Sequence, residues 1–143
     1  MAVYESHSKE DTQALGRRLA ATLRGGELIL FTGGLGAGKT AFCQGLAQGL
    51  GCTDPVSSPT FSIVNFYRGP RPLAHFDLYR VSTLADLETS GFYDYLDAGV
   101  VVAAEWSENV SDLLAGEPAI RIDIQRLPDE ENGRRIAVEG GAL

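Results

Sequence analysis

The segment "ELILFTGGLGAGKTAFCQGLAQGL", residues 27–50, decides the fold of this chain. It opens with a short apolar run, 27–32, of the kind that forms a strand buried on both faces. A glycine-rich stretch, 33–40, comes next. In residues 40–50 an apolar side chain then recurs every fourth position, which predicts a helix that stops at Gly51. The segment therefore predicts a strand, a glycine loop and a helix in direct succession.

The glycine stretch satisfies the pattern G-x-x-x-x-G-K-[ST] in full. Glycines let a loop turn its N–H groups inward, and the helix that follows offers free N–H groups and a positive dipole end to phosphates. The alternative is a flexible turn that happens to end in a lysine. The position of the loop between a buried strand and a helix favours nucleotide binding. The predicted binding residues are Gly33, Gly34, Leu35, Gly36, Ala37, Gly38, Lys39, Thr40 and Ala41.

The remainder of the chain adds strands and helices around this unit. An amphipathic helix is predicted first, with Ser8 and Asp11 at roughly capping-box spacing. A fully apolar run suggests a second buried strand, and two pairs of shorter runs suggest antiparallel hairpins. We expect one α/β domain over 1–143, a P-loop NTPase-like mixed sheet with parallel central strands and antiparallel hairpins, flanked by helices. The predicted helices are 8–23, 40–50, 84–90 and 110–114, and the predicted strands are 27–32, 61–67, 73–80, 100–105, 119–125 and 134–139.

Composition and charge restrict the partners. Twelve Lys and Arg stand against nineteen Asp and Glu, giving a net charge of −7. A protein that binds nucleic acid strongly by itself needs a basic face. We therefore expect no DNA partner, and we expect tRNA to be bound only through another protein. No apolar run is long enough to cross a membrane, and the N-terminus has no secretory signal. Cys43 and Cys52 fit neither a metal site nor a disulfide framework, so a cytoplasmic protein with reduced thiols is expected.

Two carboxylates are candidates for work on a nucleotide. Glu105 ends the run "VVVAAE", which places it at the carboxyl edge of a buried strand, where ligands of open α/β sheets gather. It has the position of a Walker-B acid, or is a strand-end carboxylate in solvent. Strand alternation puts His75, Asp77 and Tyr79 on one face, either as part of a site or as the wet face of a hairpin.

Two further residues have a structural and a functional interpretation. Thr60 lies in a proline-stiffened segment before a strand, and it could reach a γ-phosphate or Mg²⁺, or simply complete a turn. Trp106 directly follows Glu105. The default for the only tryptophan is a core aromatic, but its position suggests that it borders the site.

Four segments in this order, "GLGAGKTAF", "SSPTFSIVNFY", "HFDLYR" and "AEW", resemble the bacterial tRNA threonylcarbamoyladenosine biosynthesis ATPase family, TsaE (YjeE). The N-terminal Thr12-x-x-Leu15-Gly16 belongs to the same resemblance, which covers almost the whole chain. Gly34 departs from the family, which often has Asp at that outward-facing position.

The resemblance implies ATP, ADP and Mg²⁺ as ligands. Thr40, Glu105 and Asp77 are the implied Mg²⁺ ligands, and Lys39, Asp77 and Glu105 the catalytic residues, without deciding which carboxylate positions the attacking water. Thr60 corresponds to a switch-like segment and Trp106 to an aromatic beside the nucleotide. For the adenine pocket we expect Lys9, Thr12 and Arg134 to contribute.

The same resemblance implies partner proteins, TsaB and TsaD, which form N6-threonylcarbamoyladenosine beside the anticodon of tRNAs that read ANN codons. The expected activity is a slow ATPase that resets this pair, with residues 58–61 responding to the γ-phosphate. Two alternatives remain from the residues themselves. One is a small kinase acting on a metabolite, which usually carries an arginine-rich lid; the other is a nucleotide-sensing adaptor with little turnover.

Overall fold

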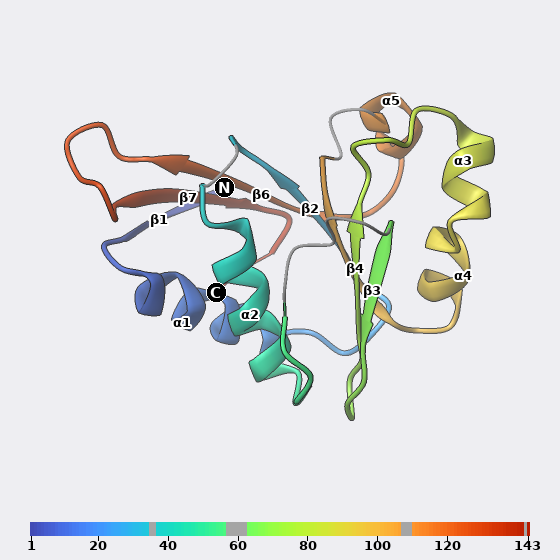
Figure 1. Cartoon of the computed structure of the whole chain (residues 1–143), viewed down its shortest axis with the longest axis horizontal. Coiled ribbons are helices and arrows are strands. Elements are labelled where there is room, and N and C mark those ends of the chain that lie inside the picture. The colour runs from blue at the N-terminus through green and yellow to red at the C-terminus, as the bar shows by residue number, and fades with distance from the viewer. Residues whose placement is uncertain (35–36, 57–62, 107–109, 142) are drawn as a thin grey trace.

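The computed structural model describes residues 1–34, 37–56, 63–106, 110–141 and 143. Within these ranges seven strands join into a single sheet, and helices cover both of its faces (Figure 1). The strands are β1 (Ala2–Ser6), β2 (Leu28–Thr32), β3 (Val64–Tyr67), β4 (Leu73–Asp77), β5 (Val101–Glu105), β6 (Ile120–Arg126) and β7 (Arg134–Glu139). The helices are α1 (Lys9–Ala20), α2 (Lys39–Gly49), α3 (Leu84–Thr89), α4 (Phe92–Asp97) and α5 (Ser111–Leu114).

The strand order is β1-β7-β6-β2-β5-β4-β3. The four central strands, β6, β2, β5 and β4, run parallel to their neighbours in this group. Antiparallel strands extend both edges: β7 and β1 beside β6, and β3 beside β4. The predicted architecture of parallel centre and antiparallel hairpins is confirmed. Its consequence for function is that β2, β4 and β5 all end at the same edge of the sheet.

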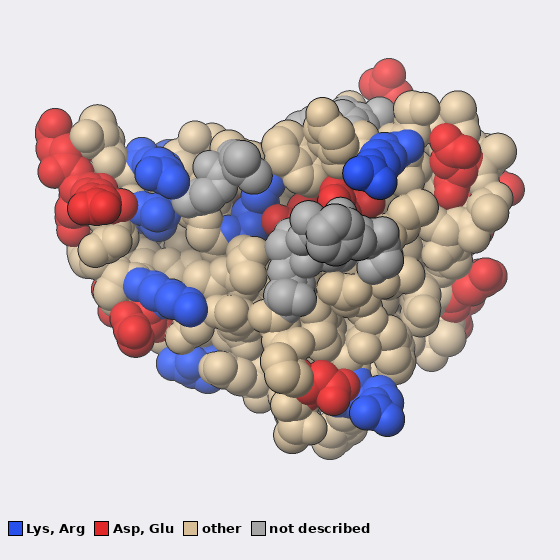
Figure 2. Space-filling view, in the orientation of Figure 1, with Lys and Arg blue, Asp and Glu red and all other residues tan. Residues whose placement is uncertain are grey.

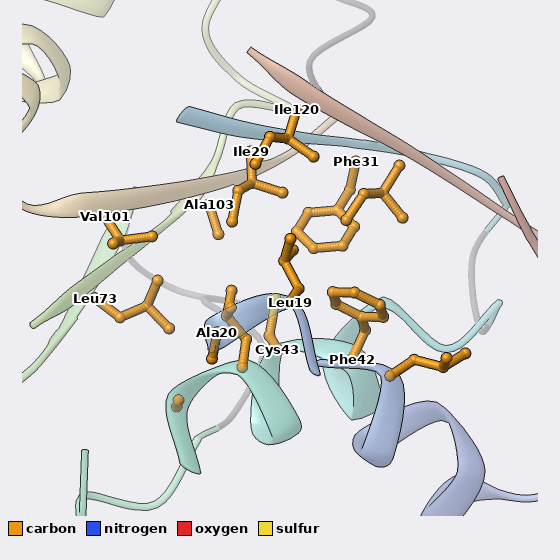
Figure 3. Packing of buried hydrophobic residues seen from close by; sticks show 14 of the residues in the cluster. Leu19, Ala20, Ile29, Phe31, Phe42, Cys43, Leu73, Val101, Ala103 and Ile120 are labelled. Atoms are coloured by element: carbon orange, nitrogen blue, oxygen red, sulfur yellow. The ribbon is translucent and has the colours of Figure 1, made fainter. Parts of the chain in front are cut away.

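Burial explains why the central strands read as continuous apolar runs. Alternate residues of β2 point to opposite faces, and Ile29 and Phe31 pack against α1 and α2, where they meet Leu19 and Phe42 (Figure 3). Leu28 and Leu30 pack on the other face, towards α3, α4 and α5. Each fully buried Leu, Ile or Phe contributes about 1.5–3 kcal/mol through area removed from water. A sheet covered on both faces is therefore the stable arrangement for these strands.

Helices α1 and α2 pack against each other unusually closely, because glycines line their contact. A Cβ built on Gly16 would lie 2.7 Å from the backbone nitrogen of Leu46, and one on Gly45 would lie 2.6 Å from the carbonyl carbon of Gln13. Any larger side chain would push the helices apart. Close packing of α1 against α2 therefore explains why the N-terminal motif has glycine at position 16. Helix α1 begins as predicted, with the Ser8 side chain accepting a hydrogen bond from the Asp11 amide.

Three local features differ from the sequence prediction. Strand β1 and helix α4 were not predicted. The strand predicted over 73–80 ends at Asp77, because Asp77 Oδ1 accepts a hydrogen bond from the Tyr79 amide at 3.0 Å and turns the chain.

The possibility that His75 lies on the wet face of a hairpin is wrong, since its side chain is fully buried. Among the described helices none combines the length and apolar character needed to cross a bilayer.

Candidate nucleotide-binding site

The loop after β2 requires glycine at two described positions. Gly33 has a φ of +128°, and a Cβ there would collide with the carbonyl oxygen of Ile124 on β6. Gly38 has a φ of +110° and precedes the first residue of α2. At Gly34 a Cβ would meet nothing within 4 Å, which agrees with the outward orientation expected there. Leu35 and Gly36, also predicted to bind, lie outside the described residues.

Helix α2 presents an uncapped N-terminus to this loop. Gly38 occupies the N-cap position and makes no side-chain cap hydrogen bond, so among the described residues no capping side chain competes for the first-turn amides. At this end of an eleven-residue helix the amides and the positive dipole end together favour an anion. Ala37, Thr40 and Ala41 flank the N-terminus, so the described part of the predicted loop is gathered around it.

Lys39 folds back over the loop it follows. Its side chain is largely buried, and Nζ donates a hydrogen bond to the Gly33 carbonyl oxygen at 3.3 Å. The same Nζ lies 4.5 Å from the centroid of the Trp106 ring, a cation–π distance. Trp106 also contacts Tyr79 edge-to-face, with ring centroids 5.3 Å apart. Trp106 therefore borders the loop, as its position after β5 suggested.

The two candidate carboxylates meet at the end of the parallel sheet. Asp77 ends β4, Glu105 ends β5, and the two residues are register partners. Beyond the strand end the Leu78 amide still donates to the Glu105 carbonyl oxygen at 3.0 Å, which fixes the two chain ends together. Glu105 is buried and Asp77 half-buried, so the solvated strand-end interpretation of Glu105 is wrong.

His75, which strand alternation placed either in a site or on the wet face of a hairpin, contacts Glu105 directly. Its Nε2 lies 2.7 Å from Glu105 Oε2 and 3.8 Å from Cys43 Sγ on α2. Burial by itself lowers the pKa of His75, but the neighbouring Cys43 sulfur and the Glu105 carboxylate outweigh it, so this pKa lies well above 6.5. The sequence signal available for this contact is strand alternation, which places His75 on the same face of β4 as Asp77, beside the strand that Glu105 ends.

The residues expected at the adenine pocket also come together. A cavity of about 220 Å³ lies beside the N-terminus of α2. Arg134 Nε donates to the Ala37 carbonyl oxygen at 2.8 Å, which ties β7 to the loop. Thr12 lines the cavity, but its hydroxyl is already paired with Ser6 Oγ at 2.7 Å. Asn132 was not predicted. The lining residues are Ser8, Lys9, Thr12, Gly38, Ala41, Asn132 and Arg134.

The side chains at this edge offer oxygen ligands of the kind that Mg²⁺ takes when it binds together with phosphates. The described residues contain no group of three or more His, Cys, Asp or Glu that could hold a metal ion. Mg²⁺ typically takes one or two carboxylates and completes its shell with phosphate oxygens and water. Thr40, Asp77 and Glu105 supply that kind of oxygen set. Oε2 of Glu105 is engaged by His75, while its Oε1 accepts no hydrogen bond from the described residues. Thr60, also predicted to bind, lies outside them.

A second cavity, of about 280 Å³, lies between β2, β6, β7 and α5 on the opposite face of the sheet. Its lining combines apolar residues, such as Leu30 and Leu114, with polar ones, such as Arg121 and Asp123, and no residue of the described loop lines it. None of the predicted site residues lines this cavity.

Comparison with known proteins agrees with this geometry. The family model described as threonylcarbamoyl adenosine biosynthesis protein TsaE matches residues 6–136. The tRNA threonylcarbamoyladenosine biosynthesis protein TsaE of Bacillus subtilis is 38% identical over 123 residues, covering 85% of this chain and 76% of that one. The protein of the same description from Treponema pallidum is 36% identical over 133 residues, covering 93% and 96%.

A solved structure is also similar to this chain. The crystal structure of YdiB from Bacillus subtilis superimposes with a TM-score of 0.78 at 32% sequence identity, covering 94% of this chain and 82% of that one. The family model spans nearly the whole chain, and it includes the loop, the two carboxylates and Arg134. This chain therefore belongs to the TsaE family of threonylcarbamoyl adenosine biosynthesis proteins.

Proposed function

We propose that this protein binds ATP with Mg²⁺ at the loop, hydrolyses it slowly, and thereby supports TsaB and TsaD in forming N6-threonylcarbamoyladenosine on tRNA. The role in that modification follows the names of the relatives. One observation carries the nucleotide chemistry: the uncapped start of α2, its buried lysine and two register-paired carboxylates lie along one edge of the sheet. Ligands of open α/β sheets bind at this edge.

Each group has a role that its position allows. Lys39 and the amides at the start of α2 bind the β- and γ-phosphates and stabilise charge that develops during phosphoryl transfer. Thr40 and Glu105 hold Mg²⁺, with Asp77 beside them, and the ion neutralises phosphate charge when it is bound. Asp77 or Glu105 orients the attacking water. Trp106 covers the lysine and excludes bulk water from its charge.

Hydrolysis without a second substrate is favoured over a metabolite kinase by the connection between β3 and β4. A kinase of this fold usually closes an arginine-rich lid over its acceptor. Here Arg71 donates hydrogen bonds to the carbonyl oxygens of Ala20, Leu23 and Gly49, at 2.9, 3.0 and 2.8 Å. It is thereby fixed to the C-terminal ends of α1 and α2 and is unsuited to a moving lid.

The charge distribution supports an indirect relation to tRNA. The net charge is −7, and on the described part of the face in Figure 2 acidic and basic side chains are intermixed without a continuous basic surface. Phosphate neutralisation dominates affinity for nucleic acid. We therefore assign tRNA binding to the partner proteins, and the nucleotide-dependent switch to this protein. Residues 58–61, which we expect to respond to the γ-phosphate, lie outside the described residues.

Release of inorganic phosphate tests the proposal. The wild-type protein is incubated with ATP and Mg²⁺ and no acceptor, alone and with TsaB and TsaD. We expect slow release alone and faster release with both partners. Glu105→Gln should lower the rate by about a hundredfold, because metal-held charge stabilisation contributes several kcal/mol. The control is Glu88→Gln, an exposed carboxylate on α3. Absence of phosphate release by the wild type with both partners would overturn the hydrolase assignment.

Partnership has a separate test. Size-exclusion chromatography of the three proteins should give a common peak with an ATP analogue and Mg²⁺, and separate peaks with no nucleotide. Co-elution that is the same with and without nucleotide would contradict the proposed switch, and separate elution in both would contradict the partnership.

A further inference from the structure

The contact between His75 and Glu105 joins three elements that carry the proposed chemistry. His75 lies on β4 two residues before Asp77, and Glu105 ends the neighbouring strand β5. His75 Nε2 is 2.7 Å from Glu105 Oε2, and Cys43, 3.8 Å from the same nitrogen, lies on the helix that begins with Lys39. His75 therefore lies where β4, β5 and α2 meet, in the protein interior beneath the two carboxylates.

The hydrogen-bond chemistry fixes which ring nitrogen carries the proton. A carboxylate that binds Mg²⁺ is ionised and can only accept, so in the metal-binding state of the site Nε2 of His75 is the donor to Oε2, whether the ring is neutral or charged. The single proton on Nε2 points to the nearer oxygen, and Cys43 Sγ is at most a weak second acceptor. The hydrogen bond therefore holds one carboxylate oxygen of Glu105, Oε2, from the buried side of the residue.

Packing alone does not account for a histidine at this position. His75 is fully buried, and its other nitrogen, Nδ1, has no hydrogen-bond partner among the described residues. A buried polar atom without a partner is destabilising, and an apolar side chain of similar volume would avoid that penalty. What an apolar side chain could not supply is the donor to Glu105.

We propose that His75 is a positioning residue that holds the Glu105 carboxylate, through the hydrogen bond from Nε2 to Oε2, in the orientation needed to bind Mg²⁺ with the nucleotide. The inference rests on the proposed function, in which Glu105 is a metal ligand. Carboxylates that bind metals are commonly oriented by a hydrogen bond on the oxygen opposite the metal, and loss of such a partner weakens metal binding by about 10–100-fold. His75 itself touches neither nucleotide nor metal.

Two substitutions of His75 separate positioning from packing. In His75→Gln the side-chain amide nitrogen can occupy the place of Nε2, whereas in His75→Asn the shorter side chain brings it only to the place of Nδ1. Both variants are polar and neutral. ADP is titrated calorimetrically in EDTA, and Mg²⁺ is then titrated into the ADP complex. We expect ADP affinity in EDTA within about twofold of wild type for both, because the loop is untouched.

The Mg²⁺ titration gives the decisive readout. His75→Asn should raise the half-saturating Mg²⁺ concentration by about tenfold, while His75→Gln stays within about threefold of wild type. Cys43→Ala, which changes the weak contact to the same nitrogen, should leave the Mg²⁺ dependence unchanged. His75→Leu, provided that circular dichroism shows it folded, should match His75→Asn.

Equal Mg²⁺ dependence in the wild type, His75→Asn and His75→Gln would overturn the positioning role. Equal weakening in the Asn and Gln variants would also overturn it, because the position of the donor would then not matter. A wild-type protein whose ADP binding does not respond to Mg²⁺ would instead overturn the proposed function, and the inference with it. The two failures are therefore distinguishable.

Discussion

Substitution of Gly45 by alanine tests how closely α1 and α2 approach. A Cβ on Gly45 would lie 2.6 Å from the carbonyl carbon and 2.7 Å from the Cα of Gln13, and closer still to its carbonyl oxygen. These are backbone atoms of α1, so no side-chain rotation can make room. The helix must shift as a body. Because α1 also lines the cavity beside the loop with Lys9 and Thr12, the shift reaches the candidate site.

Two opposing effects set the magnitude. Alanine is more favourable than glycine inside a helix by about 1 kcal/mol. Overpacking a tight contact costs about 1–3 kcal/mol, and the rigid backbone obstacle places Gly45→Ala at the upper end of that range. The net expectation is a loss of about 2 kcal/mol in the free energy of unfolding. For a chain of this length that corresponds to a Tm lower by about 6 °C.

Thermal unfolding followed by far-ultraviolet circular dichroism measures the effect. Gly116→Ala is the matched control, because a Cβ there would meet nothing within 4 Å. We expect its unfolding free energy to stay within about 0.5 kcal/mol of wild type. A Gly45→Ala protein that melts at or above the wild-type temperature would refute the close approach of the two helices.

Three further predictions concern stability, pH and spectroscopy. Arg71→Gln removes charged donors from the carbonyls of Ala20, Leu23 and Gly49 and should lower the unfolding free energy by about 3 kcal/mol in a denaturant titration. The matched substitution of the exposed Arg68, Arg68→Gln, should change it by less than about 0.5 kcal/mol. The hydrogen bond to Glu130 raises the pKa of His7, so its stabilisation is full below about pH 6.5 and is lost as pH rises through the folded-state pKa. The Tm difference between wild type and His7→Gln should therefore be larger at pH 5.5 than at pH 9, and the opposite order would contradict it. Trp106 is the single tryptophan and lies against the loop lysine, so its fluorescence should change on addition of ATP and Mg²⁺; an unchanged spectrum at saturation would contradict that placement in the nucleotide site.

Local patterns were sufficient to predict the central part of the fold. The 27–50 segment predicted β2, the loop and α2, because a doubly buried strand, a glycine run and a helical apolar repeat each have a local cause. The same holds for the cap at Ser8 and for Glu105 at a strand end. Since parallel strands end at a common edge, placing two carboxylates there was a topological consequence of the strand assignments.

The parts that were missed depend on contacts distant in sequence. β1 has little apolar pattern of its own and is held by pairing with β7 at the other end of the chain. α4 contains aromatic residues that favour strands, but burial of Phe92 against Phe76 makes it a helix. The His75–Glu105 contact spans thirty positions, and only the register of β4 on β5 brings the two side chains together.

Calorimetric titration of ATP with Mg²⁺ into wild type and Lys39→Ala tests the central claim most directly, that the loop and the start of α2 bind a polyphosphate. The account predicts saturable binding to the wild type and an affinity lower by about 10–100-fold in the variant, since a charge-assisted hydrogen bond contributes about 1.5–3 kcal/mol. Circular dichroism should show both proteins folded. Equal affinities in the two folded proteins, or no binding to the wild type, would contradict it.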